Sequence, residues 1–287
     1  MNLRSLDRRI IYLLVALALS VPLLLEYSVP PARMASADKL FSLVEELQPQ
    51  PGKIAFLALD FGPNTKAENL PQAEVMLEHL MRRRIPVAIF SLYVLAEPFL
   101  ESVPEEIAKN LMRQSPGELW EYGKDWVNLG YLPGGALIVQ GIPKSENLPE
   151  LFKQDARGNR LASVPMFQGV KGLRDVVFLG EFTGLSGMFD YYVQFFQKDG
   201  YRPLFGHGCT SITIPEAYIY MDSGQINGLL EGIAGAAWYS ERLQQLHPDR
   251  LKGSSELINT GLGFAHLIII FLIIFGNVVE FFILRRG

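Results

Sequence analysis

Residues 51–63 read PGKIAFLALDFGP, and this segment sets the expectation for the whole fold. Its centre, Lys53–Phe61, is an almost unbroken apolar run with Pro-Gly before it and Gly-Pro after it. A short apolar run between two turn signals is typical of a strand that is buried on both faces. Residues 70–84 then carry apolar side chains at helical spacing, so the first predicted unit is a buried strand followed by a helix.

The same alternation continues along the chain. Further strands are predicted at residues 86–93, 136–142, 176–182, from 202 onward and at 212–221, and helices at 38–47, 98–112, 148–154, 188–197 and 225–245, with residues 115–135 as a helix and a loop. Such alternation favours an α/β fold with a mainly parallel sheet that helices cover on both faces. Over about residues 50–245 the pattern resembles the broad Rossmann-like or flavodoxin-like class, a resemblance that implies a fold and no function.

Both ends of the chain carry long apolar segments, and each is expected to form a transmembrane helix. A spanning helix needs roughly 20 apolar residues, and residues 10–29 and 262–284 approach or meet that length. The predicted organisation is a cytoplasmic N-terminus (1–9), a first span (10–29), a linker with an entry helix (30–50), an extracytoplasmic α/β domain (51–247), a second linker (248–261), a second span (262–284) and a cytoplasmic C-terminus (285–287).

Arginine residues outside the two apolar segments predict the orientation. Arg4, Arg8 and Arg9 precede the first segment, and Arg285 and Arg286 follow the second. Because such charges stay on the cytoplasmic side, both termini are expected in the cytoplasm and the central domain in the periplasm or outside the cell, as in a bacterial inner-membrane protein. The alternative for the first segment is a cleaved signal peptide, since Ala-Ser-Ala at residues 35–37 fits a cleavage site.

Charge, motifs and cysteine content exclude several function classes. The 287-residue chain has a net charge of −4, so it lacks the basic surface expected of a nucleic-acid-binding protein. The glycine-rich turn at 180–187 lacks the residues of a P-loop or dinucleotide fingerprint, and no cofactor or metal is predicted. Cys209 is the single cysteine, so an intrachain disulfide is excluded.

Polar residues at the predicted strand ends are the candidate ligand-binding residues. Ligands of open parallel sheets gather at the carboxyl ends of the strands. The candidates there are Asp60, Glu181, Thr183, His207 and Cys209. Carboxylates and an imidazole in one crevice would hold a small ligand or a divalent cation, or perform acid–base chemistry. The alternative is that each side chain caps a turn or faces solvent.

Small residues in the predicted helix 225–245 are the candidate interface residues. They are Gly228, Gly232, Gly235 and Ala236, which recur at helical spacing. Glycine costs a helix about 1 kcal/mol relative to alanine, so close packing against this face is expected, either on the chain's own sheet or between protomers. Asn277 in the second apolar segment is a further candidate for helix–helix contact.

The predicted function is that of a membrane-anchored structural or interaction subunit whose extracytoplasmic domain docks partners or assembles with itself. The expected partners are the lipid bilayer, further copies of the chain or other membrane proteins. The arrangement is similar to accessory subunits of ABC-type transport systems, which also bracket an α/β domain with spans. The alternative is an extracytoplasmic enzyme or binding domain that uses Asp60, Glu181 and His207, although the sequence contains no complete catalytic motif.

Overall fold

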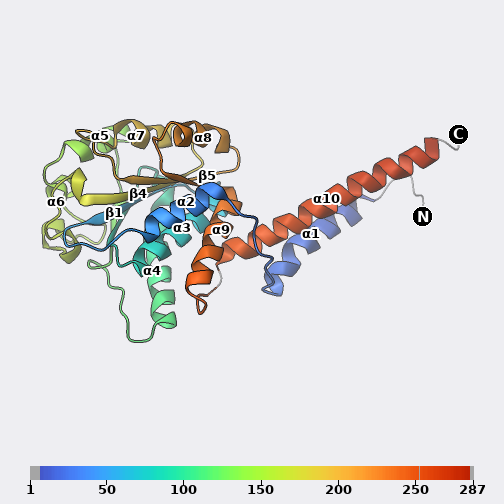
Figure 1. Ribbon diagram of the computed structural model, residues 1–287, viewed down its shortest axis with the longest axis horizontal. Coiled ribbons are helices and arrows are strands. Elements are labelled where there is room, and N and C mark those ends of the chain that lie inside the picture. The colour runs from blue at the N-terminus through green and yellow to red at the C-terminus, as the bar shows by residue number, and fades with distance from the viewer. Residues whose placement is uncertain (1–6, 252, 285–287) are drawn as a thin grey trace.

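Six parallel strands form the centre of the computed structural model, which describes residues 7–251 and 253–284 (Figure 1). The strands are β1 (Ile54–Asp60), β2 (Val87–Ser91), β3 (Trp126–Tyr131), β4 (Val176–Thr183), β5 (Leu204–Cys209) and β6 (Gly228–Glu231). They lie in the order β3-β2-β1-β4-β5-β6, and all pairs are parallel. The predicted α/β class with a parallel sheet flanked by helices is therefore confirmed.

Helices cover both faces of the sheet, as Figure 1 shows. One layer holds α2 (Ala35–Glu45), α3 (Lys66–Arg82), α4 (Glu97–Gln114) and α9 (Gly232–Leu246). The other holds α5 (Ala136–Lys144), α6 (Leu148–Phe152), α7 (Met188–Phe195) and α8 (Ile214–Asp222). Successive residues of β1 alternate between the layers: Ala55 and Leu57 pack into the first, and Ile54 and Phe56 into the second. Both faces of the strand are apolar for this reason.

The prediction of a strand at residues 136–142 is wrong, because this segment begins α5. Its buried side chains, Val139 and Ile142, are three residues apart, and Leu137 is exposed. That spacing places one helical face on the sheet. The third strand is instead β3, within the segment predicted as a helix and a loop. Its Asn128 and Gly130 weaken the strand signal in the sequence.

Two further predictions near the C-terminal side of the domain are also wrong. Residues 212–221 do not form a strand, since α8 occupies Ile214–Asp222. Residues 225–245 are not one helix, because β6 precedes α9. Gly232 separates the two elements with a φ of +52°, a left-handed conformation that glycine adopts without a steric penalty.

A pair of antiparallel helices extends from the domain (Figure 1). α10 (Ser254–Leu284) has 31 residues, and its segment Ser254–Phe281 is the one described helix long and apolar enough to cross a membrane. α1 (Arg8–Leu24) has 17 residues and contains Pro22. The prediction of such a helix at each terminus is therefore met only at the C-terminus, because α1 ends before Glu26 and below the length of roughly 20 residues. The predicted linker 248–261 is likewise shorter, since α10 begins within it.

The contact between α1 and α10 follows a regular seam along α10. The residues that face α1 are buried or half-buried and lie four and three residues apart: Gly261, Ala265, Ile268 and Leu272. This spacing is that of a left-handed helix pair. At Gly261 an added Cβ would lie 3.2 Å from the carbonyl oxygen of Leu19, so the missing side chain permits close backbone approach.

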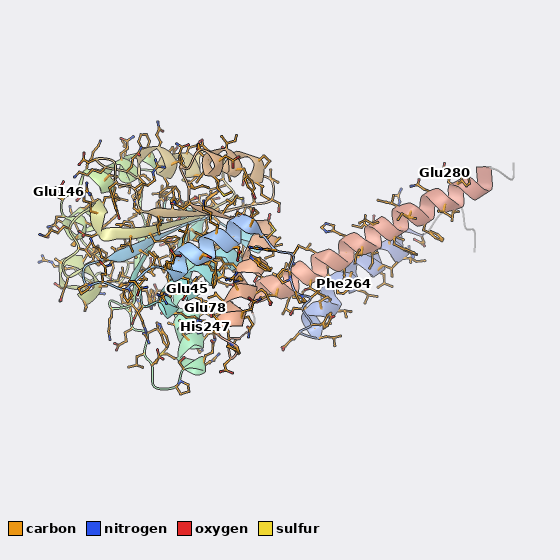
Figure 2. All side chains as sticks on the ribbon, in the orientation of Figure 1. Glu45, Glu78, Glu146, His247, Phe264 and Glu280 are labelled. Carbon is orange, nitrogen blue, oxygen red and sulfur yellow. The ribbon has the colours of Figure 1, made fainter. Side chains whose placement is uncertain are left out.

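A buried cluster of charged side chains holds the N-terminal end of α10 inside the domain. Nε of Arg250 donates to both carboxylate oxygens of Glu78 on α3, at 2.9 and 2.8 Å. Glu256, in the first turn of α10, accepts a hydrogen bond of 2.6 Å from Ser240 on α9 and lies 3.4 Å from Nη1 of Arg250. Figure 2 shows Glu78 beside the point where α10 leaves the domain. Arg250 therefore joins α3 and α10, and Ser240 extends the cluster to α9.

Replacement of Arg250 by alanine is expected to lower the free energy of unfolding by about 3–5 kcal/mol, because Glu256 would stay buried without a cation and Glu78 would keep only its ion pair with Arg82. Denaturant unfolding of the full chain in detergent, followed by tryptophan fluorescence, measures this loss. Arg33→Ala is the matched control: Arg33 pairs with Asp38, but its side chain is 73% exposed, so the loss should stay below about 1 kcal/mol. Equal small losses in both variants would contradict the anchoring role of Arg250.

Candidate functional site

The strand order reverses direction between β1 and β4, and this is the point where open parallel sheets bind ligands. Asp60 and Thr183 end these two strands and lie opposite each other in the register. Glu181 lies opposite His207 on β5. The predicted site residues therefore come from three neighbouring strands. All of them, together with Cys209, are buried.

Asp60 links three elements beneath the edge of the sheet. Its Oδ1 accepts hydrogen bonds from Ser91 Oγ at 2.8 Å and from the backbone N–H of Leu92 at 2.6 Å, and its Oδ2 accepts one from the hydroxyl of Tyr192 at 2.8 Å. Burial raises the pKa of Asp60 to about 7, although these hydrogen bonds lower it. Asp60 thus ties β1 to the end of β2 and to α7.

Glu181 and His207 form a buried pair of an acid and an imidazole. Oε2 of Glu181 lies 2.6 Å from Nδ1 of His207, and the carbonyl oxygen of Glu181 lies 3.2 Å from the same nitrogen. The geometry at Nδ1 allows a hydrogen bond with the carbonyl oxygen of Glu181. Within the described residues, neither carboxyl oxygen of Glu181 makes a hydrogen bond. Burial raises the pKa of Glu181 well above its usual range and lowers that of His207 to about 3. Near neutral pH both groups are therefore uncharged, and the contact is no salt bridge.

The space next to His207 is filled. Its ring stacks on Phe189 with the ring centres 3.9 Å apart. The hollow beside the ring, lined by Thr183, Ser186 and Glu216 among others, has a volume of about 10 Å³, enough for roughly one water molecule. The three predicted residues thus lie at neighbouring strand ends, but the space beside them is too small for a substrate larger than water.

Cys209 lies inside the core and not at a reactive surface. Its side chain is fully buried, and its Sγ contacts the carbonyl oxygen of Leu230 at 3.8 Å. Burial, together with the charge of Glu231, raises the pKa of this thiol to about 12, so a thiolate is disfavoured. Among the described residues, no three His, Cys, Asp or Glu side chains are grouped as metal ligands.

The predicted interface residues of the domain lie inside it. An added Cβ at Gly228 would lie 2.5 Å from Cβ of Leu40, and one at Gly235 would lie 2.8 Å from the backbone of Leu230. Ala236 is fully buried. Because Gly228 belongs to β6 and Gly232 begins α9, the small residues form no stripe along one helix. Asn277, in contrast, is exposed on α10.

Two polar residues that the sequence did not single out hold the strand ends together. Gln72 is buried on α3, and its Nε2 donates to the carbonyl oxygens of Cys209, Leu230 and Gly232 at 2.8, 3.0 and 2.9 Å. Tyr192 reaches Asp60 from α7. A glutamine or tyrosine within a predicted helix carries no local signal of this role, because both partners lie far away in the chain.

Comparison with known proteins adds no relative: no family model, curated protein or solved structure matches this chain.

The pair of Glu181 and His207 predicts an unusual dependence of stability on pH. Unfolded, Glu181 loses its proton near its ordinary pKa of 4.5, whereas the folded chain retains that proton to a much higher pH. The stabilising contribution of protonated Glu181 is therefore present at low pH and is lost as the pH rises. His207 has the opposite effect, since it makes stability rise with pH, but only between about pH 3 and pH 6.5. Above about pH 7, Asp60 no longer changes the stability with pH.

As the pH rises above about 7, the free energy of unfolding should therefore fall, by at most about 1.4 kcal/mol per pH unit, and Glu181→Gln should remove this fall. Denaturant unfolding across that pH range measures the slope. Glu216→Gln is the control, since Glu216 is an exposed carboxylate near the same strand ends. A slope that persists unchanged in Glu181→Gln would show that Glu181 is ionised in the folded chain.

Proposed function

We propose that this chain is a membrane-anchored structural and interaction subunit whose extracytoplasmic α/β domain docks partner proteins or further copies of itself. The observation that carries the proposal is the rigid mounting of the domain. α10 begins among buried residues of the domain, with Ser255 and Glu256 buried, and continues into its apolar stretch without a break. A helix held in this way sets the position of the domain over the membrane, which a flexible tether would not do.

The topology that we propose has two spans, with both termini in the cytoplasm. α1 and α10 run antiparallel, so the start of α1 and the end of α10 both point away from the domain, and α10 extends beyond the start of α1 (Figure 1). Arg8 and Arg9 begin α1 on this side, while Arg4, Arg285 and Arg286 lie outside the described residues. Positive charge at this end supports a cytoplasmic tip and an extracytoplasmic domain.

The packing at α2 supports a retained first segment over a cleaved signal peptide. The candidate cleavage site spans residues 35–37, and in the structure these residues form the first turn of α2. Ser36 and Ala37 are buried, and Ser36 donates a hydrogen bond to Glu231 at the end of β6. Cleavage there would require this turn to leave the domain. In the proposed topology α1, although its 17 residues fall short of the roughly 20 of a full span, crosses the bilayer beside α10 with Tyr27 near the outer interface.

The carboxyl edge of the sheet offers the docking surface on the domain. Apolar side chains are exposed in the segments that follow β2, β3 and β5: Val94, Leu95, Leu137 and Ile212. Exposed apolar side chains along this edge are candidates for protein contact. Ile212 is 89% exposed, the highest value among the large apolar side chains of the described residues. Docking of a partner would remove these side chains from water.

An accessory role in a membrane transport complex is one form of this function, in which the partner would be a membrane subunit of the transporter. The enzyme alternative has weaker support. Glu181 and His207 touch, but the hollow beside them is the size of one water molecule. A substrate would have to open the sealed strand ends before it could reach either group.

Cysteine labelling in intact cells tests the topology. Ala162→Cys, on the exposed surface of the domain, should react with a membrane-impermeant maleimide, whereas Ser5→Cys should react only after the membrane is permeabilised. The unmodified chain is the control and should stay unlabelled, because Cys209 is buried. Labelling of Ser5→Cys in intact cells would overturn the proposed orientation.

Site-specific photocrosslinking in native membranes tests the docking surface. A photoreactive residue at Ile212 should give a discrete adduct, either with one partner protein or with a second copy. The same residue at Lys171 is the matched control, since Lys171 is also exposed but precedes the amino end of β4. The absence of any adduct at Ile212, Leu137 and Val94 would remove the support for docking through this edge.

A further inference from the structure

α10 has two faces, and α1 covers only one of them. The seam residues that face α1 run from Gly261 to Leu272. The opposite face is exposed along its whole length, and it carries a second series with spacings of four and three: Gly263, Leu267, Ile270, Ile274 and Asn277. We call this series the free face of α10. It lies two residues out of phase with the seam, which is about 200° around the helix axis.

Two polar residues of the apolar stretch, His266 and Asn277, lie away from α1. Asn277 belongs to the free face, and His266 lies next to it, between Gly263 and Ile270 on the helix surface. Within the described residues, the amide of Asn277 makes no side-chain hydrogen bond, and it lies two turns before the end of α10 at Leu284. In lipid an unpaired amide is unfavourable, and such a group commonly finds a partner on another helix.

Resting on the proposed membrane anchoring, we propose that the free face of α10 binds the free face of a second copy of this chain, with the two Asn277 amides hydrogen-bonded to each other. An amide carries both a donor and an acceptor, so one Asn277 satisfies another reciprocally. Two copies in one membrane have the same orientation, which places both amides at the same depth. A two-fold axis along the membrane normal then pairs each residue of the face with itself.

The neighbouring residues fit such a contact. Gly263 has open space at its Cβ position, so a second helix can approach closely at the outer end of the free face. Leu267, Ile270 and Ile274 are each more than half exposed and would supply the apolar knobs of a left-handed pair. A single asparagine within such a series specifies which helices pair and in which register.

Disulfide crosslinking in native membranes tests the proposal. Cys209 is buried and is not expected to form a crosslink. Ile270→Cys and Ile274→Cys should form a product of twice the mass of the chain under mild oxidation. Leu272→Cys is the matched control, since it lies in the same helix but in the seam that faces α1. Asn277→Leu should raise the dissociation constant of the dimer in lipid nanodiscs roughly 3- to 30-fold, and Asn277→Gln should restore most of the affinity.

The outcomes separate this proposal from the proposed function. Equal crosslinking at Leu272 and Ile270, no double-mass product, or an unchanged dissociation constant in Asn277→Leu would each overturn the paired free faces. A specific adduct of Ile270→Cys with a different protein would also overturn the second copy as the occupant, while the docking function would stand. Failure of the photocrosslinks at the sheet edge would count against domain docking and would leave the α10 pair unaffected.

Discussion

A parallel sheet has to be covered on both faces, and the other features of this structure depend on that constraint. Parallel strands need long crossovers, and the helices in those crossovers bury both faces. In β1, alternate apolar residues therefore serve two separate cores. The crossovers also bring the ends of β1, β4 and β5 side by side, and β6 lies at one edge with α9 directly after it. The path from the sheet to α10 begins at that edge.

The same covering also buries the polar residues at the strand ends. In an open crevice, Asp60, Glu181 and His207 would form an acid–base site. Here the loops and α7 seal them, so burial keeps Glu181 and His207 uncharged near neutral pH. Asp60 is fully used in hydrogen bonds to Ser91, Leu92 and Tyr192. These buried residues hold the strand ends together. The apolar side chains in the loops around them stay exposed to solvent.

Buried side-chain contacts, rather than a flexible linker, join the domain to the apolar helix pair. Arg250 and Glu78 meet although 172 residues separate them, and Glu256 joins this cluster from α10. A buried cation with two carboxylates resists separation, because breaking any contact leaves a charge in a low dielectric. These contacts fix the direction of α10 relative to α3, so a partner bound to α10 would also set the orientation of the domain.

The sequence by itself determined the α/β class, the strands β1, β2, β4 and β5, and the apolar character of α10, because buried strands and a long apolar helix leave local patterns. It did not determine α5 or β6, since an apolar run of four to eight residues suits a strand and a helix face equally. Only the tertiary structure decided that Glu181 touches His207, that Gly228 and Gly235 pack within the domain, and which face of α10 meets α1. These outcomes depend on pairings between distant segments, and no local spacing encodes them.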